Sequence, residues 1–168
     1  MRTKEFNTHF LEHKAALFGY IFGLIKNREE AEDVLQELYL KLWRKRDSIK
    51  KETCRYYFYS SARSLSIDAL RKIKRTMDLQ FSVEYETFSE NTFEKQELSM
   101  HFRSAIDNLP GNYREVIYLV DVCMMNTAEV VDLTGLKTNN VRVILSRARN
   151  MIKEELTKIY SYERTEKS

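Results

Sequence analysis

Apolar residues recur every three or four positions along most of this chain, and this spacing predicts helices that each bury one stripe. Asn27 ends the first helix, whose repeat runs through Phe6, Phe10, Leu11, Leu17, Phe18, Ile21, Phe22 and Ile25. A second helix is predicted over residues 29–46, with a buried stripe of Ala31, Val34, Leu35, Leu38 and Leu42. A third, over 56–75, follows the non-periodic loop 47–53 and buries Tyr59, Ala62, Ile67 and Leu70. Together they predict one small domain, residues 1–75.

The same spacing returns in residues 96–168 and predicts a second domain of four helices. The first carries Leu98, Phe102, Ala105, Ile106 and Leu109. After the break at Pro110-Gly111, the next begins with Val116, Ile117, Leu119 and Val120. Asn126 or Thr127 then caps a short helix that runs through Leu133. Gly135 supplies a left-handed turn, and Thr138 caps a long last helix through Ile159.

Residues 76–95 separate the two predicted domains. They are acidic and rich in Ser and Thr, with no sustained apolar period, which indicates a flexible linker. The whole chain holds only four Gly and one Pro, too few for a protein built of hairpins and tight turns. The expected fold is therefore all-α, with two small helical domains joined by this linker.

Charge is distributed unevenly along the chain. Residues 44–75 hold eleven basic and three acidic residues, and residues 137–158 hold six basic and two acidic ones. Between them, residues 76–97 hold one Lys and six acids. Basic surfaces of this kind attract polyanions, because each neutralised phosphate releases condensed counterions. Nucleic acid is therefore the first partner to expect.

The sequence shows no pattern typical of a catalytic centre. It lacks a glycine-rich phosphate loop, a nucleophile elbow and a paired acid–base set, so we expect neither an enzyme nor a bound cofactor. His9 and His13 lie one helical turn apart, but no further ligands follow at metal-binding spacing, so we expect no metal. Cys54 and Cys123 are isolated thiols that fit a reducing cytoplasm. Neither a signal peptide nor a membrane span is expected.

Residues 127–147 have the order of a helix-turn-helix: a short helix, a glycine turn and a longer basic helix. The two helices would pack through Val130, Leu133, Leu136, Val141 and Leu145. The outward set would then be Thr138, Asn139, Asn140, Arg142, Val143, Ser146 and Arg147. A helix fits the major groove, where Arg pairs with guanine and Asn with adenine. The alternative is an ordinary helical hairpin with a solvated basic face.

The basic segment 44–75 combines cations with four successive aromatic residues, 56–59. The cations are Arg44, Lys45, Arg46, Lys50, Lys51, Arg55, Arg63, Arg71, Lys72, Lys74 and Arg75. Tyr56, Tyr57, Phe58 and Tyr59 cannot all face one helical stripe, so at least one ring should lie near the surface and could stack on an unpaired base. The alternative places Tyr57, Phe58 and Tyr59 in the core.

The second predicted helix combines an acidic face with aromatic residues. Glu29, Glu30, Glu32, Asp33, Gln36 and Glu37 are followed by Tyr39, Leu40 and Trp43, which we expect to be exposed. Interfaces between proteins are enriched in large aromatic residues, so this face is a candidate docking surface. The alternative folds Trp43 back against its own domain.

Residues 31–43 (AEDVLQELYLKLW) resemble the AEDxxQExFxxxW signature of extracytoplasmic-function (ECF) sigma factors, members of the sigma-70 family. In that family this helix binds the coiled-coil clamp of the largest subunit of RNA polymerase. The resemblance covers about residues 6–75 and 96–158. It implies that the core-polymerase contacts are Asp33, Gln36, Glu37, Tyr39 and Trp43.

Other motifs extend the resemblance to both DNA-binding regions. Residues 60–72 resemble the helix that engages and melts the minus-ten element, and the loop 47–55 resembles the loop that captures a flipped base. This implies a minus-ten set of Lys50, Lys51, Arg55, Tyr56, Tyr57, Arg63 and Arg71. Residues 109–110, 113–116 and 145–149 resemble the LP, QREV and LSRAR motifs of the second domain, which in the family reads the minus-thirty-five element. The residues 124–127 (MMNT) replace the usual Gly-Leu-Ser-Tyr, and Ile144 stands where the family often has a basic residue.

The resemblance implies a transcription-initiation factor whose partners are bacterial core RNA polymerase, promoter DNA and an anti-sigma factor. The residues leave two other functions open. One is a dimeric helix-turn-helix regulator that binds DNA through residues 96–158 without polymerase, with residues 1–75 as a dimerisation or effector module. The other is a helical adaptor whose charged islands are only solvated surface.

Overall fold

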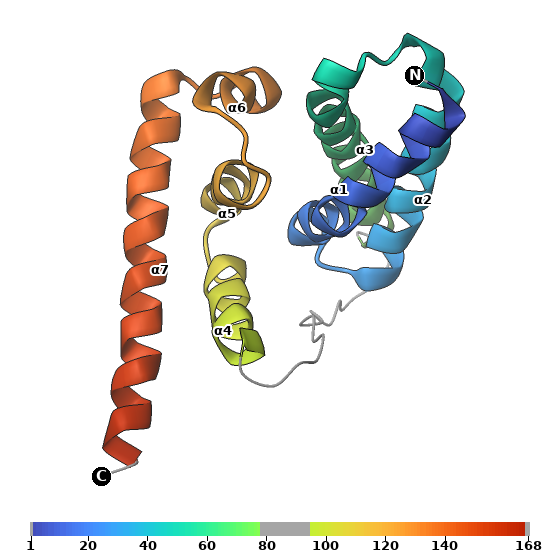
Figure 1. Ribbon diagram of the computed structural model, residues 1–168. Helices are drawn as coiled ribbons and strands as arrows, with labels where there is room; N and C mark the ends of the chain where they lie inside the picture. Colours follow the sequence, from blue (N-terminus) through green and yellow to red (C-terminus); the bar gives the residue numbers. More distant parts are fainter. Residues whose placement is uncertain (1, 78–94, 167–168) are drawn as a thin grey trace. The chain divides into compact units, whose positions relative to one another are not determined.

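The computed structural model describes the backbone of residues 2–77 and 95–166, and the side chains of residues 2–76 and 101–161. The chain divides into two compact units, Met1–Glu86 and Thr87–Ser168. Every regular element in the described ranges is helical (Figure 1). None of these helices combines the length and the apolar character needed to cross a membrane. The predicted all-α fold of two helical domains is confirmed, whereas the predicted linker lies mostly outside the described residues.

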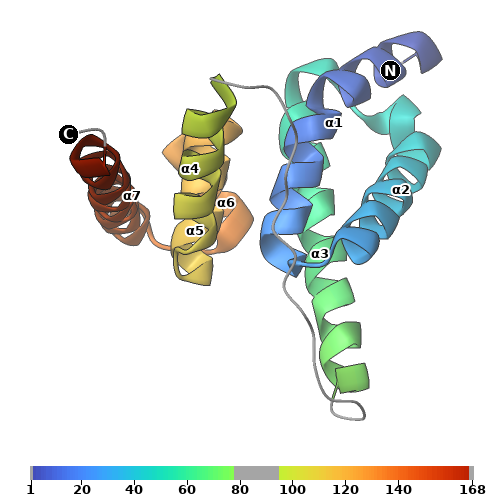
Figure 2. The same cartoon turned by 90° about the horizontal axis from the view of Figure 1, so that it is seen from below.

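The first unit is a bundle of three helices: α1 (Thr3–Ile25), α2 (Arg28–Lys45) and α3 (Cys54–Met77). Each helix contacts the other two, and two views show them packed side by side (Figures 1 and 2). Lys26 closes α1 in the left-handed conformation, and the Asn27 side chain then caps α2 by accepting a hydrogen bond of 3.0 Å from the Glu30 amide. Two residues therefore reverse the chain. The helix α3 extends beyond its predicted end and includes Thr76.

Phe6 lies at the centre of the first unit. Its fully buried ring has its centroid between 5.7 and 6.0 Å from four other aromatic rings, those of Phe10, Tyr39, Trp43 and Phe58. These rings come from all three helices. Tilted and edge-to-face pairs of this kind add about 0.5–1.5 kcal/mol each beyond the area they bury. The cluster therefore fixes the position of α2 against α1 and α3.

Four residues placed in the predicted buried stripes of the first unit are not fully buried. Leu11 is 66% exposed, while Phe18, Ile67 and Leu70 are only half-buried. The buried face of α3 instead carries Cys54, Phe58, Tyr59, Ser61, Ala62, Leu65 and Ser66. Tyr59 and Ala62 were predicted for this face, whereas the pattern missed its two serines, which are small enough to pack between helices but are not apolar.

In the second unit, four shorter elements pack against one side of a long helix (Figure 1). These are α4 (Lys95–Asp107), α5 (Gly111–Ile117), the π-helical turn η3 (Tyr118–Val122) and α6 (Thr127–Thr134), followed by α7 (Thr138–Glu166). The helix α7 contacts α4, α5 and α6. The core of this unit comprises Ala105, Ile106, Leu109, Val116, Ile117, Leu119, Cys123, Met125, Val130, Leu133, Val141, Ile144, Leu145, Ala148 and Ile152. The predicted core residue Leu98 lies outside the described side chains.

Local capping sets the turn between α6 and α7. The Asn126 side chain accepts from the Glu129 amide at 2.9 Å, and the Glu129 carboxylate accepts from the Asn126 amide at 2.9 Å. This capping box starts α6, and Gly135 ends it with φ +74°, a conformation that only glycine adopts without strain. Of the two predicted caps, Asn126 is therefore correct. Thr138 is already the first residue of α7 rather than a residue before it.

We predict that Phe6→Ala destabilises the first unit by about 3–5 kcal/mol, the usual cost of truncating a fully buried aromatic ring. Leu11→Ala on the same helix is the matched control and should change the free energy of unfolding by less than about 0.5 kcal/mol, since that side chain is exposed. Urea unfolding followed by the fluorescence of Trp43, the single tryptophan, measures both. Equal effects would contradict the placement of Phe6 at the centre of the core.

We predict opposite effects for two Gly→Ala substitutions in the second unit. A Cβ added at Gly135 or at Gly111 meets no atom within 4 Å, so only the backbone distinguishes the two sites. Gly135→Ala should destabilise by roughly 1–2 kcal/mol, because an L-residue is strained at positive φ. Gly111→Ala, in the first turn of α5, should stabilise by roughly 0.4–1 kcal/mol through lower entropy of the unfolded chain. Thermal melting followed by circular dichroism distinguishes them.

Candidate functional site

The outer face of α2 presents an exposed stripe of mixed chemistry. Asp33, Gln36 and Glu37 are all exposed, and they share one side of the helix with Leu40, which is 52% exposed. A leucine this exposed among carboxylates gives the face an apolar centre with an acidic surround. This is the composition of a surface that binds an amphipathic, basic partner.

Tyr39 and Trp43 do not project into solvent as predicted, because both fold back against the first unit. The Tyr39 ring meets Phe10 edge-on at 5.0 Å, and its hydroxyl donates to Asn7 Oδ1 at 3.1 Å. The Trp43 ring stacks on the Tyr39 ring, with 5.9 Å between the ring centroids, and meets the Phe6 ring edge-on, with 5.7 Å between the centroids. The alternative interpretation of Trp43 is thus the correct one. Both side chains remain half-buried, so part of each ring still reaches the surface beside the α2 stripe.

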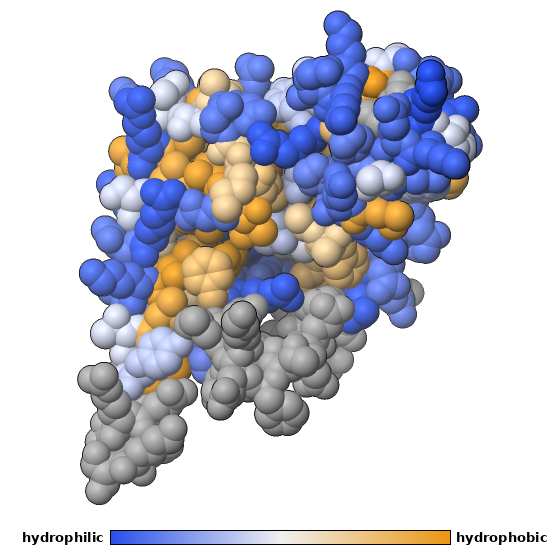
Figure 3. Space-filling view, in the orientation of Figure 1, coloured by the Kyte–Doolittle hydropathy of each residue, from blue (hydrophilic) through white to orange (hydrophobic). Residues whose placement is uncertain are grey.

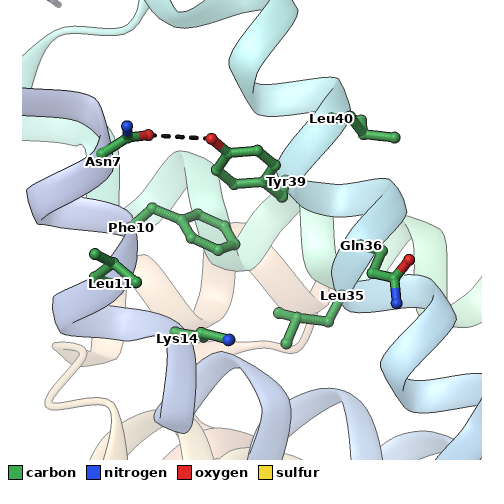
Figure 4. Close-up of a pocket in the computed structure, with 8 residues that line it drawn as sticks. All are labelled: Asn7, Phe10, Leu11, Lys14, Leu35, Gln36, Tyr39 and Leu40. Atoms are coloured by element: carbon green, nitrogen blue, oxygen red, sulfur yellow. Dashed lines mark hydrogen bonds between the residues drawn. The ribbon is translucent and has the colours of Figure 1, made fainter. Parts of the chain in front are cut away.

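A groove of about 530 Å³ lies between α1 and α2, next to this stripe (Figure 4). Its walls are Asn7, Phe10, Leu11, Lys14, Leu35, Gln36, Tyr39 and Leu40. Gln36 and Tyr39 were predicted as site residues, but the contribution of α1 was not. Leu11 could have indicated this contribution. Because it belongs to the apolar repeat of the first helix, it was predicted to lie in the core.

The loop between α2 and α3 consists of two short 3-10 turns, η1 (Arg46–Ser48) and η2 (Lys51–Thr53). Ile49 between them is buried, and Lys50 and Lys51 point into solvent. Hydrophilic residues cover this end of the first unit (Figure 3). The loop is therefore an ordered basic projection and not a disordered connection.

The remaining residues of the predicted minus-ten set lie along α3. Arg55, Tyr56, Tyr57 and Arg63 are half-buried, and Arg71 is exposed with a 3.4 Å ion pair to Asp68. The rings of Phe58 and Tyr59 are fully within the core. Both sequence interpretations of the aromatic run are thus partly correct: its second half is core, and its first half reaches the surface. Tyr56 and Arg63, seven positions apart, share one side of the helix.

His9 and His13 behave as structural residues. His9 Nδ1 lies 3.2 Å from Glu12 Oε2, while the His13 ring packs edge-on against Phe58 and Tyr59. Burial lowers the pKa of His13, with Glu12 acting in the opposite direction, so the neutral imidazole is favoured. Within the part of the chain that the structure describes, no three His, Cys, Asp or Glu side chains are grouped to hold a metal ion. Burial likewise raises the pKa of the Cys54 thiol.

The first turns of α7 form the second candidate DNA surface. The structure exposes the whole predicted set: Thr138, Asn139, Asn140, Arg142, Val143, Ser146 and Arg147. The intervening positions Val141, Ile144 and Leu145 are buried against the rest of the unit. Ile144 therefore belongs to the core, which explains why an apolar residue is acceptable there.

Two arginines of the second-unit motifs hold its elements together. Arg149 on α7 makes a two-pronged ion pair with Asp121 of η3, with distances of 2.6 and 3.1 Å, and this hydrogen bonding raises the pKa of Arg149. Arg114 on α5 donates to the carbonyls of Asp107 and Leu109 at 2.8 and 2.9 Å. It thereby satisfies carbonyl groups where α4 ends. The Arg149 pair thus joins α7 to η3, and Arg114 joins α5 to the end of α4.

Comparisons with known proteins agree with this arrangement. Residues 9–76 match the family model "Sigma-70 region 2", and residues 99–152 match "Sigma-70, region 4". The chain is 30% identical to the RNA polymerase sigma factor SigV of Bacillus subtilis over 154 residues, covering 90% of each protein. It is 23% identical to the ECF RNA polymerase sigma factor SigM of the same species, covering 82% of this chain and 86% of SigM.

Solved structures share the fold. The sigma factor RpoE, crystallised with the anti-sigma factor NepR from Bartonella quintana, superposes with a TM-score of 0.79 at 23% identity, over 92% of this chain and 98% of that one. CnrH, in complex with the cytosolic domain of CnrY, gives 0.63 at 19% identity, over 94% of this chain and 90% of CnrH. With both sigma-70 regions present in order and a relative matched over nearly its full length, the chain belongs to the ECF sigma factors of the sigma-70 family.

Proposed function

We propose that this sigma factor binds bacterial core RNA polymerase through the exposed stripe of α2 and the adjoining groove, and so directs initiation at specific promoters. The observation that carries the proposal is the alignment of Asp33, Gln36, Glu37 and Leu40 on one solvent-facing side. The apolar centre supplies burial, and the surrounding carboxylates steer a basic partner and fix its orientation.

Tyr39 and Trp43 have a different part in this proposal from the one the signature implies. Because Phe6, Phe10 and Asn7 hold both rings, their main effect is to set the position of α2. A rigid stripe loses little conformational entropy on binding, which favours affinity. Their remaining exposed edges extend the contact surface beside Leu40.

The basic loop and α3 would engage the minus-ten element. Lys50 and Lys51 on the loop, with Arg55, Arg63 and Arg71 on α3, attract the phosphate backbone. Tyr56 and Tyr57 offer half-exposed rings on which an unpaired base can stack, a contact worth about 1–3 kcal/mol per base. This is comparable to the few kcal/mol needed to unstack a base, so opening needs no nucleotide hydrolysis by this chain.

The exposed face of α7 would read the minus-thirty-five element in the major groove. Its first turns carry the donors and acceptors that distinguish base pairs, and the buried face of the same turns anchors them to α4, α5 and α6. Two weak DNA contacts on one polymerase-bound protein reinforce each other through effective concentration.

The same considerations suggest where and with what the protein acts. Promoter DNA and polymerase place it in the bacterial cytoplasm. The sigma factor of similar fold from Bartonella quintana binds the anti-sigma factor NepR, and we propose a partner of that class for this chain. The runner-up function, a dimeric helix-turn-helix regulator, uses α6 and α7 alone and gives the α2 stripe no role.

We predict that Asp33→Ala/Gln36→Ala/Leu40→Ala lowers the affinity for core polymerase by at least about tenfold, since central interface residues often cost more than about 1 kcal/mol each. Met151→Ala/Glu154→Ala removes an exposed apolar residue and an acid from α7 and is the control. Binding is measured by fluorescence anisotropy with labelled sigma factor, and circular dichroism confirms folding. If both variants bind like the unmodified protein, the α2 stripe is not the docking face.

We predict that Arg142→Ala/Arg147→Ala relaxes discrimination between promoter sequences, because each base-reading arginine contributes about 1–3 kcal/mol. The control Lys153→Ala/Lys158→Ala removes two exposed cations further along α7 and should weaken binding slightly without changing sequence preference. Salt-titrated mobility shifts of the holoenzyme on matched and mutated upstream elements measure both. Equal losses for the two pairs would indicate charge attraction alone.

A further inference from the structure

Arg46 begins the loop between α2 and α3, and neither the motifs nor the proposed contacts give it a role. Its guanidinium carbon lies 4.5 Å from the centroid of the Trp43 ring, stacked over that ring. Its Nη1 also donates a hydrogen bond of 2.8 Å to the Trp43 carbonyl, in the last turn of α2. The Arg46 side chain therefore contacts both the ring and the backbone carbonyl of Trp43.

Trp43 is itself held on its other sides. The Phe6 ring meets it edge-on at 5.7 Å and Tyr39 stacks on it at 5.9 Å. The ring thus joins the aromatic core of the first unit to Arg46. A planar guanidinium stacks on an indole and donates in a fixed direction at the same time, which the compact ammonium of lysine cannot do.

The loop that follows is anchored at three points. Arg46 fixes its start, the buried Ile49 fixes its middle, and the buried Cys54 fixes its end. The exposed basic residues Lys50 and Lys51 lie between the second and third anchors. Of the three anchors, Arg46 alone acts through a polar stack at the edge of the core. Substitution of Arg46 should therefore change the conformation of the loop without leaving a cavity in the core.

We infer that Arg46 is a positioning residue: by stacking on Trp43, it holds the basic loop, with Lys50 and Lys51, in the conformation that engages the minus-ten element. Promoter opening should then depend on Arg46 more strongly than polymerase binding does, because Asp33, Gln36, Glu37 and Leu40 are exposed on α2 before the loop begins. This inference rests on the proposed function of the loop in the minus-ten element.

The test compares two neighbouring arginines in the full-length protein. Arg46→Lys and Arg46→Ala remove the stack, and Arg44→Lys and Arg44→Ala make the same changes at an exposed site. Trp43, the single tryptophan, reports the stack directly through its emission and its quenching by acrylamide. Polymerase affinity is measured by anisotropy, and strand opening by permanganate reactivity of unpaired thymines in a promoter that the unmodified holoenzyme opens.

Both Arg46 variants should expose Trp43 to quencher and reduce opening by about tenfold or more, the scale of loss expected from a misplaced binding group, while polymerase affinity falls by a clearly smaller factor. Arg44→Lys, which keeps the charge, should match the unmodified protein in all three measurements, and Arg44→Ala should leave the quenching of Trp43 unchanged. Because Arg46→Lys retains the charge, its defect distinguishes positioning from phosphate attraction.

Three results would overturn the inference. They are full opening by Arg46→Lys, an equal loss of polymerase affinity and opening, or unchanged quenching of Trp43 in both Arg46 variants. Failure of the unmodified protein to bind polymerase or open any promoter is a different result. It would refute the proposed function itself, and this inference with it.

Discussion

The packing of aromatic rings around Phe6 is the interaction on which the first unit depends. Five rings from three helices meet there, and they leave α2 one rigid position relative to α1 and α3. The exposed stripe of α2 and its groove are consequences of that position, because Phe10 and Tyr39 form both core and groove wall. The same cluster ends at Trp43, where Arg46 connects it to the basic loop. The core, the proposed docking face and the basic loop are thus joined by one continuous set of contacts.

The second unit uses one helix in an analogous way. Each of the first turns of α7 has a buried side, with residues such as Val141 and Ala148, and an exposed side, with residues such as Arg142 and Arg147. The core contacts that stabilise α7 therefore also determine which of its residues face solvent. The Arg149–Asp121 ion pair and the contacts of Arg114 lock the neighbouring elements. Because charged surface residues contribute little to stability, the outer face is free to be selected for recognition.

Function in this protein divides between attraction and positioning. In the proposed function, basic residues on the loop, on α3 and on α7 supply a field that draws DNA without regard to its sequence. Selectivity requires that a few donors and rings stay fixed while DNA is bent or opened around them, and fixed groups come only from packed helices. The half-buried residues Tyr56, Tyr57 and Arg63 illustrate this, since each is partly core and partly surface.

The sequence by itself determined the helical class, the two units, a cap of α6 at Asn126 or Thr127, the turn at Gly135 and the exposed face of α7. These follow from local spacing and backbone preference, which act within a few residues. Tertiary structure decided the rest. Leu11 is exposed although it belongs to an apolar repeat, whereas Trp43 packs against its own domain. Ser66 is buried although it is polar. Burial depends on which side of a helix meets a neighbour distant in sequence, and periodicity within one helix does not specify that neighbour.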